Sequence, residues 1–380
     1  MTKAASITHD PFAGAHNMLV HCGGFQAGDR LLIVHEDPSL GWYDKSIAEV
    51  VASSARAIGA LPEIVEVGGP DAPPPPALGE KLERSDGVVY LARIGDQDRF
   101  APRTSNKPVI VSYARDVPAL ASAYGRADHR AFLALKSAID DLLFGCRTIR
   151  ISCPLGTEVT GSVDPVFRDT GEVTVRRFPM GVPQPMPATT FEGRVALTRC
   201  LIPTGSHSYE PAALMLDGVA FARISGGRIT GFDGAPDLVR SIQNHYAHVA
   251  GLFEIDPAVV HSWHAGLHPA SAFHGRFTDD PDRWSNTIFT SPRFLHFHTC
   301  GAYAPGEICW MVLDPTIRLD GRKLWADGRL CVDIFPELEP VLTAWPVLGR
   351  LFSMGSQPLG IATFEAGSAP QQMYEILHHE

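Results

Sequence analysis

The first third of the chain alternates short apolar runs with amphipathic segments. Four short, mainly apolar segments have the length and composition of strands and lie at residues 30–35, 61–67, 87–94 and 108–113. Two other segments carry apolar side chains at helical spacing: residues 46–60, and residues 128–145, which Asp128 can cap and Gly145 can end. Strands that alternate with helices predict an α/β N-terminal domain, residues 1–145, with a parallel sheet.

The pattern changes after residue 145. Turn dipeptides now lie between short apolar runs, as in β-hairpins, at Gly226-Gly227, Asp320-Gly321 and Asp327-Gly328. One clear helical pattern remains, at residues 236–253. We therefore expect residues 146–380 to form a mostly β domain, α+β and barrel-like, that carries the catalytic site.

The net charge limits the kinds of partner to expect, and the cysteine content indicates the kind of cell compartment. The chain carries 32 Lys and Arg against 42 Asp and Glu, a net charge of −10, so we expect neither nucleic acid nor an anionic membrane as a partner. No apolar stretch approaches about 18 residues and no apolar signal core follows the N-terminus, so we expect no membrane span. Seven cysteines without a CxxC spacing argue against a disulfide framework and favour a reducing, cytoplasmic location.

Histidines gather in one part of the second half. Eight of the sixteen lie between His245 and His298. In a strand, His296 and His298 point to the same side, about 6–7 Å apart, and can bind one metal ion. The third ligand must come from elsewhere, and both His261 and His264, just after the predicted helix, are candidates. The alternative is that the pair forms only a polar strand face.

Three further residues are candidates for acid–base roles. Glu158 follows a Gly-Thr turn, where it is either a site carboxylate or an exposed turn residue. His207 and Tyr209 lie in the loop at residues 203–211, which is long enough to act as a lid and is otherwise a plain surface loop.

Short segments spread over most of the chain resemble one enzyme family. Residues 155–160 (LGTEVT) look like its Gly-Thr-Asp-Leu-Thr motif, residues 178–181 (FPMG) look like Phe-Pro-Gly-Gly-Glu, and residues 295–298 (LHFH) fall at its His-x-Asp. Further similar segments lie at residues 27–34, 57–60, 266–269 and 319–321. The family is the thermophilic metallo-aminopeptidases (the aminopeptidase T and S group), and the likeness is nearest to its 2,5-dihydroxypyridine 5,6-dioxygenase branch. The resemblance implies an aminopeptidase-like fold and a homo-oligomeric metalloenzyme.

The departures from that family concern its carboxylates. Val182 stands where the family has Glu, His298 stands where it has Asp, and no matching Glu occurs around His264. Two divalent ions about 3.5–4 Å apart need bridging carboxylates, so a two-metal peptidase is disfavoured. The dioxygenase relatives hold one ferrous ion with two His and one Asp. That set maps here to His296 and His298, with either His264 or His261 as the third ligand.

The resemblance and the residues together predict a mononuclear non-haem Fe(II) dioxygenase. Three facial ligands leave positions for O₂ and for a small hydroxylated aromatic or N-heteroaromatic ring that chelates the metal. Glu158, His207 or Tyr209 would then assist proton transfer. Two alternatives stay open. One is a zinc-dependent metallohydrolase of the aminopeptidase or amidase type, with zinc-bound water, and the other is a scaffold that has lost its metal.

Overall fold

The computed structural model describes residues 10–97, 99–102, 105–168, 172–203, 209–301 and 306–361. It divides into two compact units. Unit 1 comprises Met1–Phe132 and Val173–Met180, and unit 2 comprises Leu133–Glu172 and Gly181–Glu380. The chain therefore returns to unit 1 for one short segment. The sequence alone suggests one boundary, at residue 145, and contains no sign of this return.

Unit 1 is built on a parallel sheet whose described strands are ordered β2-β1-β3-β4-β7. These strands are β1 (Arg30–Glu36), β2 (Leu61–Val67), β3 (Gly87–Leu91), β4 (Val109–Ser112) and β7 (Arg176–Phe178). β1 is buried along almost its whole length, as expected of a parallel strand covered on both faces. The predicted N-terminal parallel sheet is confirmed.

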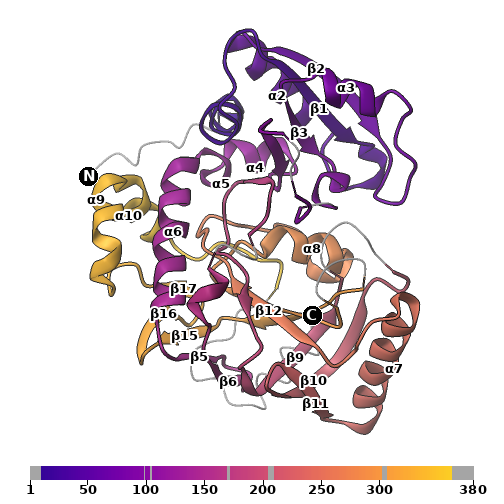
Figure 1. Cartoon of the computed structure of the whole chain (residues 1–380), viewed down its shortest axis with the longest axis vertical. Helices are drawn as coiled ribbons and strands as arrows, with labels where there is room; N and C mark the ends of the chain where they lie inside the picture. The colour runs from indigo at the N-terminus through magenta and orange to yellow at the C-terminus, as the bar shows by residue number, and fades with distance from the viewer. Residues whose placement is uncertain are drawn as a thin grey trace. The chain divides into compact units, whose positions relative to one another are not determined.

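Helices cover the sheet of unit 1. They are α1 (Pro11–His16), α2 (Ile47–Ala57), α3 (Leu78–Arg84), α4 (Val117–Ala121) and α5 (Ala123–Arg126). α1 packs against α2. α2 lies beside β1 and β2 (Figure 1) and contributes Ile47, Val51 and Ala55 to the core. These residues recur every four positions, which places them on one helix face. α6 (His129–Gly145) follows, and its residues from Leu133 onward belong to unit 2.

The larger sheet of unit 2 has the order β11-β10-β9-β6-β5-β15-β16-β17 within the described residues. Its strands are β5 (Ile149–Ser152), β6 (Glu158–Gly161), β9 (Glu192–Leu201), β10 (Leu214–Ser225), β11 (Arg228–Asp233), β15 (Thr316–Leu319), β16 (Arg322–Ala326) and β17 (Arg329–Leu330). All neighbours are antiparallel. The three predicted hairpins are confirmed, because each turn dipeptide joins two paired strands.

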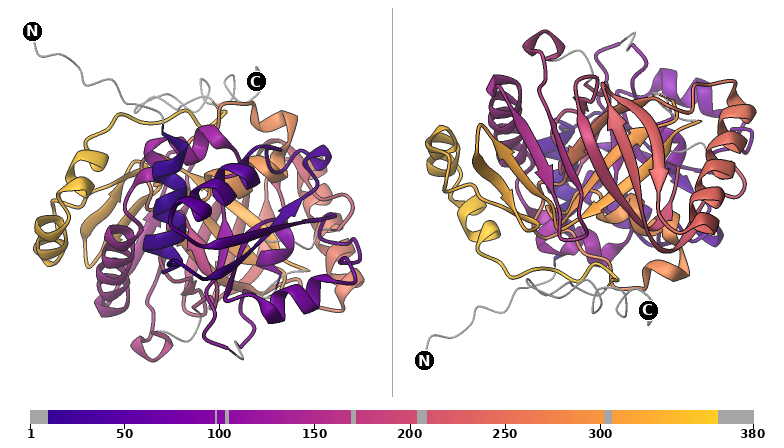
Figure 2. Two further views of the ribbon diagram at one scale, coloured as in Figure 1. Left: turned by 90° about the horizontal axis from the view of Figure 1, so that it is seen from above. Right: turned by 90° about the horizontal axis from the view of Figure 1, so that it is seen from below.

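The smaller sheet of unit 2 has the order β14-β13-β12-β8 among the described strands. They are β8 (Met186–Pro187), β12 (Val260–Ala265), β13 (Phe294–Thr299) and β14 (Ile308–Leu313). The predicted helix α7 (Pro236–Phe253) lies beside β10 (Figure 2), and α8 (Pro281–Ile288), α9 (Glu339–Ala344) and α10 (Pro346–Phe352) complete the unit. The expected mostly β C-terminal half is confirmed, and its described strands form two antiparallel sheets.

Two further properties of the described chain concern membrane-spanning helices and disulfides. No helix within these ranges is both long enough and apolar enough to cross a bilayer. All seven cysteines lie in described segments, and all are free thiols.

The hairpin between β10 and β11 provides a matched test of backbone geometry. Gly226 and Gly227 both have positive φ, at 56° and 68°. A Cβ on Gly226 would meet open space, whereas one on Gly227 would lie 2.7 Å from Thr189 Cα and 2.8 Å from Ala188 O. We predict that Gly226→Ala lowers the free energy of unfolding by about 1 kcal/mol. Gly227→Ala should lower it by about 1–3 kcal/mol more, because backbone atoms must move.

Urea unfolding of the two variants measures this difference. The denaturation midpoint of Gly227→Ala should fall further below wild type than that of Gly226→Ala. Equal losses would show that the hairpin does not pack against residues 188–189 as described.

Candidate metal centre

The strand β13 carries two of the predicted ligands in fully buried surroundings. All six of its residues are buried. Side chains alternate along a strand, so His296 and His298 lie on one face while Leu295 and Phe297 lie on the other. Phe297 packs against the ring of Trp310, at 5.9 Å between ring centroids. The apolar residues thus fix the strand in the core and orient both imidazoles the same way.

A β-bulge in β12 selects the third histidine. Val260 pairs with Thr299, but the next pairs are Ser262 with His298 and His264 with His296. His261 is therefore an extra residue in β12 that has no partner in β13. If the register at Val260 continued unchanged, Trp263 would lie opposite His296. Because the bulge shifts the register by one residue, His264 takes that place.

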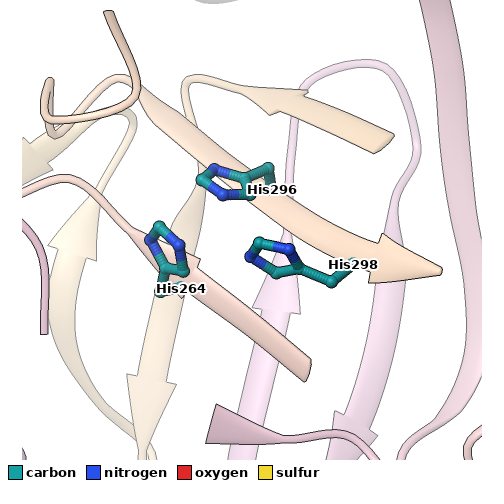
Figure 3. Close-up of side chains that lie close together, drawn as sticks. All are labelled: His264, His296 and His298. Atoms are coloured by element: carbon teal, nitrogen blue, oxygen red, sulfur yellow. The ribbon is translucent and has the colours of Figure 1, made fainter. Parts of the chain in front are cut away.

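Three imidazoles consequently converge from two neighbouring strands (Figure 3). The ring centroids of His264 and His296 are 3.9 Å apart, those of His296 and His298 are 4.6 Å apart, and those of His264 and His298 are 5.2 Å apart. One ligand nitrogen from each ring lies within 4.8 Å of the other two. All three residues are buried. Among the described residues, this group of histidines could hold one metal ion.

A carboxylate fixes the orientation of one ring. His298 Nδ1 donates a hydrogen bond to Glu307, which is 1% exposed and directly precedes β14. With the proton at Nδ1, Nε2 is unprotonated and can ligate a metal. No described residue forms a hydrogen bond with His298 Nε2, although that atom is buried. A buried nitrogen lone pair directed toward two other imidazoles fits a metal ligand.

Apart from Glu307, the described neighbours of the three rings are mainly apolar. The rings of Phe294 and Phe289 lie 5.6 and 6.4 Å from that of His296. Cys309 pairs with His298 across the sheet, and burial holds the pKa of its thiol well above the ordinary value. The thiol therefore stays neutral and does not compete as a thiolate ligand. Three neutral imidazoles with a nearby carboxylate suit one divalent transition metal, iron or zinc.

The other predicted residues lie outside this group. His261 is half-buried at the bulge, its Nδ1 lies 3.3 Å from Ser262 Oγ, and burial lowers its pKa. Tyr209 is buried and donates to the backbone carbonyl of Glu307 at 3.1 Å, while burial raises the pKa of its phenol. Glu158 pairs with Arg150 on neighbouring strands of the larger sheet. His207 lies outside the described residues.

The sequence reasoning missed Glu307. A usable signal existed, because an apolar run at residues 308–313 follows the His-x-His strand after a short connection. If the two runs form an antiparallel pair, the residue that precedes the second run lies close to His298. The observed register, with Thr299 opposite Ile308, has this arrangement.

We predict that Glu307→Ala weakens metal binding by about 10–100-fold, because His298 loses the group that sets its tautomer and ring orientation. Glu307→Gln should lose less, since its amide oxygen can still accept from Nδ1. Isothermal titration of metal-free protein with Fe(II) or Zn(II) under argon gives the affinity. The exposed Glu192→Ala is the control and should match wild type. Unchanged affinity in Glu307→Ala would contradict the assigned role.

Comparisons with known proteins define the fold more closely than the chemistry. No family model matches the chain, and no curated protein matches it. Among solved structures, the chain is similar to 2,5-dihydroxypyridine dioxygenase from Pseudomonas putida, with a TM-score of 0.56 and 12% identity over 86% of this chain and 98% of that chain. It is also similar to wild-type AmpT from Thermus thermophilus, with a TM-score of 0.48 and 13% identity over 84% of this chain and 99% of that one. The resemblance inferred from the sequence motifs is therefore confirmed at the level of the fold.

Proposed function

We propose that this protein is an Fe(II)-dependent dioxygenase that cleaves a small hydroxylated aromatic or N-heteroaromatic ring. The observation that carries the proposal is the buried group of three imidazoles, in a fold shared with a dioxygenase that is named for a dihydroxylated pyridine. The proposed partners are the ring substrate and O₂, and the proposed assembly is a homo-oligomer.

The charge of the site supports a single metal per chain. The three candidate ligands are imidazoles, which bind a metal as uncharged ligands, and the nearby carboxylate of Glu307 is engaged with His298. Val182, at the position where the related peptidases carry Glu, is fully buried. A pair of divalent ions would lack the bridging carboxylates that reduce their mutual repulsion.

The roles of the protein residues follow from their contacts. His264, His296 and His298 would hold the ion and leave other positions open for a chelating substrate and O₂. A ferrous ion in this site would supply the one-electron chemistry that O₂ activation needs. Glu307 keeps the His298 proton at Nδ1, and Tyr209 holds the backbone of Glu307 in place. The rings of Phe289 and Phe294 keep water away from one side of His296.

Proton transfer during the reaction is a separate part of the proposal. Tyr209 keeps its proton because burial raises its pKa, and its hydrogen bond to Glu307 favours a positioning role. Acid–base roles for Glu158 and His207 stay predictions. Glu158 pairs with Arg150 on the larger sheet.

Hydrolysis is the second candidate, because one observation favours it. Three neutral imidazoles are also the donor set with which zinc activates water near neutral pH. The choice between iron and zinc therefore decides between the two reaction classes.

We predict that protein purified under argon and loaded with Fe(II) binds one iron per chain. It should consume O₂ with at least one ring of a panel of dihydroxylated benzenes and pyridines. His264→Ala should lose metal occupancy by about 10-fold or more, whereas His261→Ala, at the bulge, should keep its iron. Metal analysis and oxygen-electrode traces measure both effects.

The same preparation loaded with Zn(II) serves as the comparison, assayed with fluorogenic peptide amides and aryl amides. Amide hydrolysis by the zinc form, together with no O₂ uptake by the iron form, would replace the dioxygenase proposal with the hydrolase. Failure of the intact three-histidine protein to bind either metal would refute both.

A further inference from the structure

Arg177 lies in β7, the segment that returns to unit 1, and is 6% exposed. It pairs with Val111 in β4, and the backbone N–H of Tyr113 donates to Phe178 O at 2.6 Å. Just before β7, Thr174 donates to Arg99 O through both its backbone N–H (2.7 Å) and its hydroxyl (3.1 Å). The segment that carries Arg177 thus contacts Tyr113 through Phe178 and the backbone of Arg99 through Thr174.

The guanidinium of Arg177 has no counter-ion in the described part of the chain. It forms no hydrogen bond or ion pair with the residues described, and its Nε is fully buried without an acceptor. Arginine stays protonated in proteins, so this is a buried positive charge. An unpaired buried charge is strongly unfavourable unless another group neutralises it.

The carboxylates of this region already have other partners. Asp96 accepts from the hydroxyl of Tyr113 at 3.1 Å, and its oxygen Oδ2 lies 3.7 Å from Arg99 Nη1. Glu36 is fully buried and accepts from Arg93 through the backbone N–H and Nε, both at 2.9 Å. Neither carboxylate forms an ion pair with Arg177 among the described contacts.

Arg99 and Arg177 both influence the pKa of Tyr113. Burial raises the pKa of the Tyr113 phenol and Asp96 raises it further, while Arg177 and Arg99 both oppose the rise. Both guanidinium groups therefore lie within electrostatic range of one hydroxyl.

We propose that Arg177, with Arg99 beside it, binds a small oxyanion of the carboxylate or phosphate type. The planar guanidinium fork matches two oxygens of either group and forms charge-assisted hydrogen bonds with them. A bound oxyanion would supply the counter-ion that the protein lacks at this position. The site belongs to unit 1, and the inference does not rest on the proposed metal chemistry.

Thermal unfolding of the full-length, metal-free protein tests the site. At constant ionic strength, replacing chloride with inorganic phosphate or with acetate should raise the Tm by about 2–4 °C near saturation. Arg177→Gln should abolish this shift, and Arg56→Gln, an exposed residue of α2 in the same unit, should retain it. A shift with phosphate alone or with acetate alone identifies which oxyanion class binds.

A second readout separates a binding role from a structural one. In chloride, Arg177→Gln should unfold no lower than wild type, because it removes an uncompensated buried charge. A large fall in Tm for Arg177→Gln in chloride would show that the guanidinium has a structural partner and would overturn the proposal. Equal phosphate and acetate shifts in wild type and Arg177→Gln, or no shift with either anion, would overturn it as well.

Direct binding covers the case in which Arg177→Gln does not fold. Equilibrium dialysis of wild type with labelled phosphate or acetate should give one bound anion per chain. Arg177→Lys, which keeps the charge but loses the fork, should bind at least about 10-fold more weakly. Saturable binding that is equal in wild type and Arg177→Lys would contradict the assignment. Since no metal is present, failure of this test leaves the dioxygenase proposal untouched.

Discussion

The antiparallel register of β12 and β13 is the constraint on which the candidate site depends. Side chains of residues paired across two strands lie on the same face of the sheet. A shift of one residue in the register therefore moves each β12 side chain to the opposite face relative to β13. The bulge at His261 makes that shift and places His264, rather than Trp263, opposite His296. The indole of Trp263 is instead fully buried and packs against Phe191. The same register thus buries Trp263 and places His264 opposite His296.

The negative charge near the candidate site comes from Glu307, which contacts one of the three histidines. The resemblance places a carboxylate ligand at position 298, and this chain has histidine there. Glu307 hydrogen-bonds to that histidine, so the acidic group lies one side chain further from the metal position. Such a carboxylate increases the basicity of an imidazole ligand and holds its ring in place. An Asp at position 298 would be shorter and would lie near Glu307, where two acidic groups repel each other.

Buried charge is handled in two different ways in this protein. Glu36 and Arg93 neutralise each other within unit 1, with hydrogen bonds that use both the side chain and the backbone of Arg93. Arg293 and Asp314 form a comparable buried pair in unit 2. Arg177 departs from this pattern, because the described residues provide no acceptor for its guanidinium. A bound oxyanion would give this guanidinium the partner that Arg93 has in Glu36 and Arg293 has in Asp314.

Local sequence patterns determined most of the elements and two of the three candidate ligands. Apolar runs and turn dipeptides predicted the parallel strands, the three hairpins and α7, and the period of two along a strand was enough to place His296 and His298 on one face. Three features depended on the tertiary structure: the choice of His264 over His261, the contact of Glu307 with His298, and the return of β7 to unit 1. Each of these depends on the register or pairing of separate strands. Periodicity along one strand carries no information about its neighbour, because long-range packing of the core sets the register between them.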